Sequence, residues 1–239
     1  MSSIFEADSP LLRFLGRFAD VMILNLVFVV TSLPIVTIGA SLTALNFTAM
    51  RLADGTCESV TRDYLRSWRL NLKQATVIWG LVVGMGVVLY LWFRVAEYLD
   101  VPGAVRFAVY AVVYLVTFRF VIALVFLFPY LAKFEGTTRE VLRNARKLSL
   151  RHLFASIAML AVITLPVVIT IFYPNLTGYG VLWLVIGFGA IAFVNAFLLS
   201  AIFHRYIPAD AEPDADPQPE PGPGATTAAD PATRLDPGT

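Results

Sequence analysis

Long apolar runs separated by short polar segments dominate the first 206 residues of the chain. Five of these runs reach about the 20 residues that an α-helix needs to cross the hydrocarbon core of a bilayer. They lie at residues 20–38, 75–93, 107–131, 153–173 and 181–203. Because a lone strand cannot satisfy its backbone hydrogen bonds in lipid, each run is predicted to be helical. The pattern therefore predicts an all-α, polytopic transmembrane bundle of about five spans.

The first of these runs is interrupted, and its topology stays open. Pro34 and Gly39 interrupt it, and a second apolar stretch, residues 40–50, follows. A proline removes one helical hydrogen bond and bends the helix, and broken helices in membrane proteins often line a cavity. Two interpretations remain: one kinked span, or a hairpin of two segments that raises the total to six. A kink that serves packing is the simpler explanation of Pro34.

Two basic segments each lie between apolar runs: TRDYLRSWRLNLKQ at 61–74 and TREVLRNARKLSLRH at 138–152. In each, three arginines recur at helical spacing beside apolar residues, which predicts two amphipathic interfacial helices lying on an anionic leaflet. The arginines are Arg62, Arg66, Arg69, Arg139, Arg143 and Arg146. Membrane anchoring is the simpler explanation of this charge, and a docking surface for a cytoplasmic partner is the functional one.

The basic residues are distributed unevenly over the predicted loops, and this distribution predicts the orientation. Eleven Lys and Arg residues lie in the two loops that contain the basic segments, whereas the opposite loops contain only Arg94 and Arg106. Cytoplasmic loops carry an excess of such residues, so the basic loops and the C-terminal tail are predicted to be cytoplasmic. The side of the N-terminus depends on the first run, for which Arg13 and Arg17 mildly favour the hairpin.

The composition is typical of a protein in a bilayer, and it distinguishes a C-terminal tail from the rest of the chain. Hydrophobic residues make up 58% of the chain and charged residues 15%, and the mean hydropathy is +0.73, beyond what the core of a soluble domain needs. Residues 207–239 contain seven acidic residues and one arginine among many prolines and alanines. Such a segment cannot bury enough apolar surface to fold. We therefore predict a transmembrane domain, 1–206, and a disordered tail, 207–239.

Arg119 lies near the centre of a predicted span, where insertion costs about 2.5–3.5 kcal/mol. Its donors therefore need acceptors, and the candidates include Asn25, Asn195 and carbonyls freed near Pro34. One interpretation is an arginine that is hydrogen-bonded inside the bundle. The other is a ligand site near the midplane, formed by Arg119, Asn25, Asn195 and Pro34.

Motifs for catalysis or metal binding are missing from the sequence. Cys57 is the only cysteine, so the chain cannot form a metal site from several thiolates. His152 and His204 lie at predicted span ends, where a histidine can sit at the membrane interface without binding a metal. Nucleophile-elbow, P-loop and zinc-protease patterns are absent as well. We therefore predict no enzyme activity, no cofactor and no metal. A nucleic acid is not an expected partner, since no recognition fold accompanies the basic charge.

Two stretches resemble the signatures of the YesL-like family of bacterial membrane proteins, whose function is unknown. They are NLVFVVTSLPIVTIGASLTAL, from Asn25 to Leu45, and FPYLAKFEGTTREVLRNARKLS, from Phe128 to Ser149. The resemblance extends over about residues 5–206 and implies a multi-pass protein of the bacterial inner membrane. Members are often encoded near carbohydrate importers, so it also implies an accessory or regulatory role in carbohydrate uptake. It brings no catalytic residues and does not extend to the tail.

Three classes of function are compatible with these observations. A non-enzymatic accessory protein that docks a membrane transporter complex is favoured by the duplicated basic loops. A small transporter or channel with a midplane site around Arg119 is the alternative. A membrane-embedded enzyme is the weakest, because the predicted spans contain no carboxylate or histidine near their centres. The lipid bilayer is a partner in every case, and the sequence leaves a homo-oligomer open.

Overall fold

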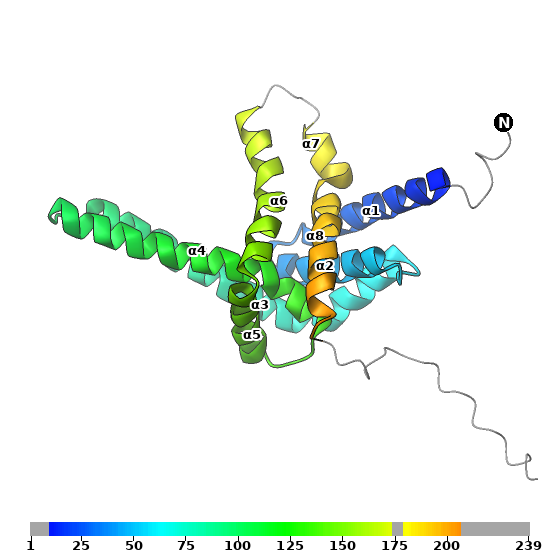
Figure 1. The fold of residues 1–239 in the computed structure, drawn as a ribbon, viewed down its shortest axis with the longest axis horizontal. Coiled ribbons are helices and arrows are strands. Elements are labelled where there is room, and N and C mark those ends of the chain that lie inside the picture. Colours follow the sequence, from blue (N-terminus) through cyan, green and yellow to red (C-terminus); the bar gives the residue numbers. More distant parts are fainter. Residues whose placement is uncertain (1–9, 174–178, 207–239) are drawn as a thin grey trace, which may run out of the picture. The chain divides into compact units, whose positions relative to one another are not determined.

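The computed structural model describes residues 10–173 and 179–206, and every regular element in these ranges is a helix (Figure 1). The chain divides into two units, Met1–Phe203 and His204–Thr239, and the helices belong to the first. The tail predicted to be disordered, residues 207–239, lies outside the described residues. The helices are α1 (Pro10–Ser32), the 3₁₀ turn η1 (Ile35–Thr37), α2 (Ile38–Asp54), α3 (Val60–Tyr98), α4 (Gly103–Lys133), α5 (Thr138–Arg151), α6 (Leu153–Phe172), α7 (Tyr179–Leu182), the π-helix η2 (Trp183–Gly187) and α8 (Phe188–Phe203).

Six helical segments of the described chain are long and apolar enough to cross a membrane. They are Leu11–Ser32, Ile35–Asp54, Val60–Tyr98, Gly103–Lys133, Leu153–Phe172 and Gly180–Phe203. The prediction of an all-α polytopic bundle is therefore confirmed, with six candidate spans instead of five. The sixth comes from the first apolar run, for which the two-segment alternative holds.

Pro34 is the break that divides this first run. It has extended backbone, with φ −74° and ψ 114°, and a proline also disfavours helix at the residue before it. Thr37 then fixes the turn, because its hydroxyl donates to the carbonyls of Thr31 and Pro34, each at 2.8 Å. The chain continues into α2, which packs against α1. Pro34 thus separates two helices and does not merely bend one.

The first basic segment is helical, but it is not a helix of its own. It forms the first part of α3, which continues for 39 residues from Val60 to Tyr98. At 1.5 Å per residue such a helix is about 58 Å long. The prediction of a separate interfacial helix at 61–74 was wrong, because no glycine or proline lies between residues 61 and 79 to end the helix.

The second basic segment does form its own helix, α5, as predicted. A capping box starts it: the Thr137 side chain accepts from the Glu140 N–H, and the Glu140 carboxylate accepts from the Thr137 N–H at 2.9 Å. These two bonds satisfy backbone donors that a helix start otherwise leaves unpaired. Val141, Ala145 and Leu148 form the buried face. Its arginines remain on the exposed side.

α2 lies at the centre of the first unit and packs against α1, α3, α4 and α8. Small residues such as Ala40, Ala44 and Ala49 are fully buried along it. At Gly39 a Cβ atom would lie 2.5 Å from the carbonyl oxygen of Ala75, so only glycine allows α2 and α3 to approach this closely. Close contact between small residues thus stabilises the basic half of α3 against α2.

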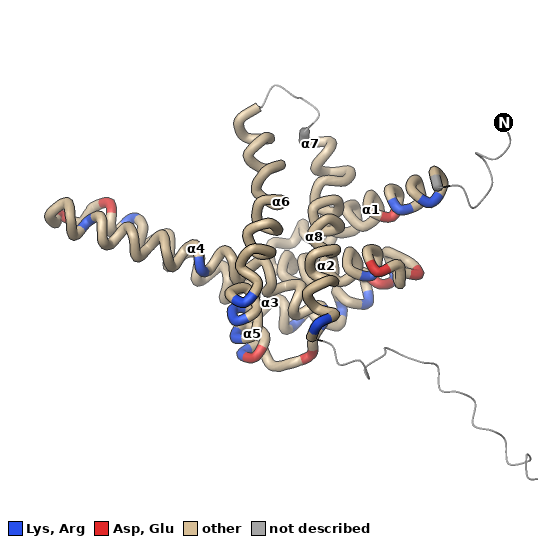
Figure 2. Tube along the Cα trace, in the orientation of Figure 1, with Lys and Arg blue, Asp and Glu red and all other residues tan. Residues whose placement is uncertain are grey.

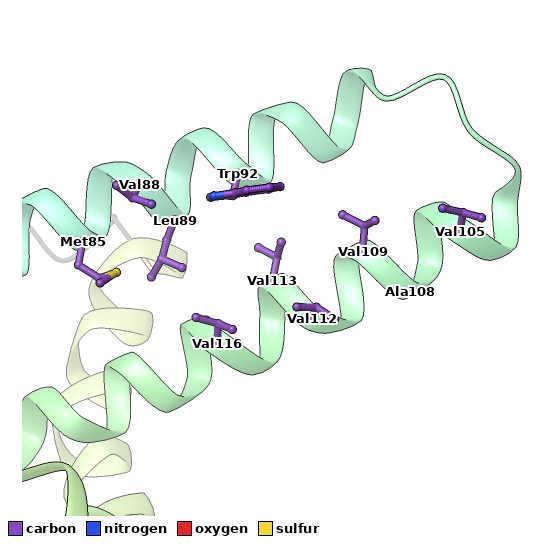
Figure 3. A pocket seen from close by; sticks show the side chains of 10 residues that line it. All are labelled: Met85, Val88, Leu89, Trp92, Val105, Ala108, Val109, Val112, Val113 and Val116. Carbon is purple, nitrogen blue, oxygen red and sulfur yellow. The ribbon is translucent and has the colours of Figure 1, made fainter.

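The second half of α3 and the first half of α4 form a pair that carries mostly exposed apolar side chains. Figure 1 shows these halves running together away from the other helices, and Phe93 contacts the rings of Tyr110 and Tyr114 near their ends. Between the same halves lies an apolar pocket of about 510 Å³, whose lining includes Met85 and Trp92 (Figure 3). Such surfaces suit contact with lipid chains.

Candidate functional site

One hydrogen bond links the end of the first basic segment to the residues just before the second. The Gln74 side chain of α3 donates to the carbonyl of Gly136, just before α5, at 2.8 Å. Figure 2 shows the Lys and Arg residues of α5 and of the first half of α3 toward the same side of the first unit. Six arginines form what we call the basic surface; each is exposed, and within the described residues none of the six forms a hydrogen bond or an ion pair. They are Arg62, Arg66, Arg69, Arg139, Arg143 and Arg146.

A polar cavity of about 500 Å³ lies beside the first set of arginines, between α2, α3 and the segment that joins α4 to α5. Its charged lining residues are Arg51, Arg66, Lys133 and Glu135. Arg51 is engaged, because its guanidinium contacts Asp63 at 3.2 Å and donates to the carbonyl of Thr56 at 2.7 Å. Arg66 and Lys133 make no such bond in the described part of the chain. As far as the structure describes the chain, the cavity therefore presents two cations without a partner.

An apolar groove of about 410 Å³ lies beside the second set of arginines, between α3, α4 and α5. Its walls are apolar side chains of α3 and α4, among them Met85, Phe120 and Leu124. Its polar edge is formed by Arg139, Arg143 and Arg146 of α5. The two halves of the basic surface thus adjoin different environments, a polar cavity on α3 and an apolar groove on α5.

Hydrogen bonding holds the only carboxylate of α5 as an anion. The backbone N–H and hydroxyl of Thr137 lower the pKa of Glu140, and the charge of Arg143 lowers it further. One oxygen of the Glu140 carboxylate accepts from both the N–H and the hydroxyl of Thr137, each at 2.9 Å, so Glu140 stabilises the start of the helix; within the described residues it forms no ion pair with an arginine.

Cys57 lies near the Arg51–Asp63 ion pair. Burial, a hydrogen bond to Asp63 and the charge of Asp63 together raise the pKa of its thiol to about 12, against a smaller opposing effect of Arg51. The thiol is therefore uncharged at neutral pH. Among the described residues there is also no group of three or more His, Cys, Asp or Glu side chains that could hold a metal ion; that the protein uses no metal stays a prediction.

Asn25 has a role that the sequence did not predict. Its amide nitrogen donates to the carbonyls of Trp183 and Leu184, at 3.1 and 2.6 Å, and its amide oxygen accepts from the Gly189 N–H at 2.9 Å. A π-helix shifts backbone bonding out of the α-helical pattern, and Asn25 binds backbone groups at and just after η2. A change in helix type has no recognisable signal in the sequence here.

Arg119 and Asn195 each keep a buried polar atom without a hydrogen-bond partner among the described residues: one guanidinium nitrogen of Arg119 and the amide oxygen of Asn195. The Asn195 nitrogen donates weakly to the Met159 carbonyl at 3.5 Å. Asn25 is engaged at η2, and Pro34 is exposed at the break after α1. No hydrogen bond within the described ranges joins these residues to Arg119, so a shared site around it stays a prediction.

Comparison with known proteins adds one match. Searches of curated proteins and of solved structures gave no match. Residues 21–93, fewer than a third of the chain, match a family model described as "Protein of unknown function, DUF624". The matched part holds most of α1, all of α2 and most of α3, and so includes Pro34, Asn25 and the first basic segment. Over these residues, this polytopic membrane protein is similar to the proteins of the DUF624 family, whose function is unknown.

Proposed function

We propose that this protein is a non-enzymatic accessory or regulatory component of a membrane complex, and that it binds the complex through its basic surface. The polar cavity is the observation that carries this proposal. Arg66 and Lys133 line it without a partner in the described structure, while Glu135 is the only acidic residue of its lining. An acidic segment of a partner would supply the missing acceptors.

Exposed arginines without internal ion pairs are available for recognition. A guanidinium binds a carboxylate through two parallel hydrogen bonds, and complementary charge increases the rate at which partners meet. Anchoring to lipid alone would need the charge but would not need a polar cavity beside it. The geometry therefore favours a protein partner at the α3 half of the surface.

The resemblance to the YesL-like family supports a more specific proposal. It points to the bacterial inner membrane and to a carbohydrate importer as the complex. The excess of Lys and Arg on this side supports a cytoplasmic location for the surface. An acidic surface of an importer subunit that faces the cytoplasm is then the expected partner.

Cross-linking and mass spectrometry of the protein, purified from its native membrane in mild detergent, tests the proposal. One variant reverses the charge of Arg62, Arg66 and Arg69, and another that of Arg139, Arg143 and Arg146. A variant that reverses Arg94, near the end of α3, and Arg106, near the start of α4, is the control. A stoichiometric partner that either test variant loses and the control retains supports the proposal. A partner retained by both test variants, or a wild-type protein without a partner, overturns it.

The buried guanidinium nitrogen of Arg119 favours a second candidate, a small transporter or channel for anions. A cation held near the middle of a span without an internal acceptor is costly, and a passing anion would offset that cost. Proteoliposomes that take up radiolabelled phosphate or chloride, and lose uptake on Arg119→Ala but not on Arg94→Ala, would support it. Uptake equal to that of empty vesicles would rule it out for these anions.

A further inference from the structure

The apolar groove has apolar walls and one positively charged edge. Leu81 and Met85 of α3, with Phe120 and Leu124 of α4, form apolar walls, and Arg139, Arg143 and Arg146 of α5 form one edge. The three arginines recur every three or four residues, so they occupy one face of α5. Each is exposed and makes no hydrogen bond or ion pair with any described residue.

The position of the groove along α3 sets the level at which it meets the bilayer. The basic part of α3 ends near Lys73, and the groove begins two turns later, at Leu81. The arginines therefore lie where the polar part of the bundle changes to the apolar part. Lipid phosphates occupy the same level of a bilayer, with acyl chains directly beneath them.

We propose that this groove is a binding site for an anionic phospholipid. The phosphate lies against the arginines of α5, and one acyl chain lies along Leu81, Met85 and Phe120. Guanidinium groups bind phosphate through paired hydrogen bonds, and the apolar walls replace neighbouring lipid around the chain. A zwitterionic lipid fills the same groove but brings a cationic group close to three arginines, so the site selects negative charge.

An acidic peptide suits this groove less well than a lipid. Apart from the arginines, the residues that line it are apolar, and a peptide backbone placed there would find no hydrogen-bond partners. The polar cavity beside α3, by contrast, includes Asn71 and Gln74 in its lining. The inference does not depend on the accessory role: a protein without any partner would still bind the lipid.

Native mass spectrometry of the full chain in mild detergent tests the inference, with phosphatidylglycerol and phosphatidylcholine added in separate titrations. One variant carries Arg139→Gln, Arg143→Gln and Arg146→Gln. Its matched control carries Arg62→Gln, Arg66→Gln and Arg69→Gln and so loses the same charge. We expect wild type and control to prefer phosphatidylglycerol, and the α5 variant to bind it at least tenfold more weakly. Circular dichroism and size-exclusion chromatography show whether each variant is folded.

A second variant addresses the apolar part of the site. Leu81→Trp narrows the groove while every arginine remains, so phosphatidylglycerol binding should fall although the charge is unchanged. Glycerol 3-phosphate, which has the phosphate without the chains, should not compete at equal concentration. Equal losses in the two Gln variants, no preference for phosphatidylglycerol, or full competition by glycerol 3-phosphate would each overturn the inference. If the α5 variant does not fold, the Leu81→Trp variant and the competition with glycerol 3-phosphate still test the inference.

Discussion

Asn25 stabilises the contact between α1 and the irregular start of the last candidate span. The residue is fully buried, and its amide forms three hydrogen bonds with backbone groups of residues 183–189. Gly189 allows the approach, since a Cβ there would lie 2.7 Å from the Val21 carbonyl oxygen. Backbone groups inside a membrane protein must find partners within the protein. Asn25 supplies them at the start of η2 and just after its end.

Replacing this amide should therefore destabilise the protein. Asn25→Leu removes a buried hydrogen-bond partner from the backbone near η2, and each group left unsatisfied costs about 1–3 kcal/mol. We expect a clear decrease in the thermal unfolding temperature of the purified protein in detergent. Asn46→Leu is the control, because within the described residues that amide donates only to the Leu42 carbonyl of its own helix. Equal decreases for the two variants would contradict the role of Asn25.

At the scale of elements, α5 is a short helix whose start depends on its cap. Thr137→Ala removes the side-chain half of the capping box, and such substitutions cost on the order of 1 kcal/mol. The amides of residues 138–141 should then exchange with deuterium faster than in wild type at neutral pH. Thr138→Ala, one residue further on, is the control. Unchanged exchange in Thr137→Ala would show that tertiary contacts alone maintain the first turn.

The pH dependence of this cap follows from the lowered pKa of Glu140. A carboxyl group with a lowered pKa in the folded state stabilises that state at pH values above its ordinary pKa of 4.5. The contribution is lost as the pH falls from there through the lowered value. The difference between wild type and Glu140→Gln should accordingly be present at pH 7 and disappear in strong acid, which thermal unfolding across this range can measure.

The helices differ in how well their sequences predicted them. For α5, the alternation of Val141, Ala145 and Leu148 with arginines predicts an amphipathic helix, and a capping box starts it where the pattern begins. For α3, the change from basic to apolar sequence near residue 75 suggested a boundary that does not exist. Hydropathy reports environment, whereas a helix ends only where its backbone bonding ends. Pro34 did end a helix, and the sequence left that alternative open.

The candidate site was only partly predictable for a similar reason. Helical spacing identified the arginines of both basic segments, because spacing is local. Their relative placement comes from contacts between residues far apart in the sequence, such as the packing of α3 and α5 against α4 and the bond between Gln74 and Gly136, which are 62 residues apart. The polar cavity and the apolar groove likewise arise from packing between helices. No local pattern distinguishes the two sets of arginines, although they adjoin different environments.

At the scale of the whole molecule, a crossing by each of the six candidate spans would put both ends of the helical unit on one side of the membrane. Combined with the distribution of Lys and Arg, this predicts that the N-terminus is cytoplasmic, along with the segment between α4 and α5. The segment between α3 and α4 then lies outside. An odd number of crossings would separate the two ends.

Single-cysteine labelling in intact spheroplasts measures this topology. A membrane-impermeant maleimide should label Asp100→Cys directly, and Ser3→Cys and Glu135→Cys only after lysis. The native Cys57 should contribute little background, because maleimides react with thiolates and its pKa is about 12; the unmodified protein is the control. Labelling of Ser3→Cys before lysis would show that α1 and α2 do not both cross.

Because α3 is unbroken, it can tilt as one rigid rod. Its basic half lies against α2, its other half extends among apolar side chains toward Tyr98, and no proline interrupts it. α3 is held close to α2 at the contact between Gly39 and Ala75, where only a glycine fits. About 35 Å of helix lies beyond that point. A small tilt of α3 imposed at Arg62 would therefore displace the end of the helix near Tyr98 by a larger distance. A force applied to the basic surface would in this way reach the paired halves of α3 and α4 while α3 stays helical.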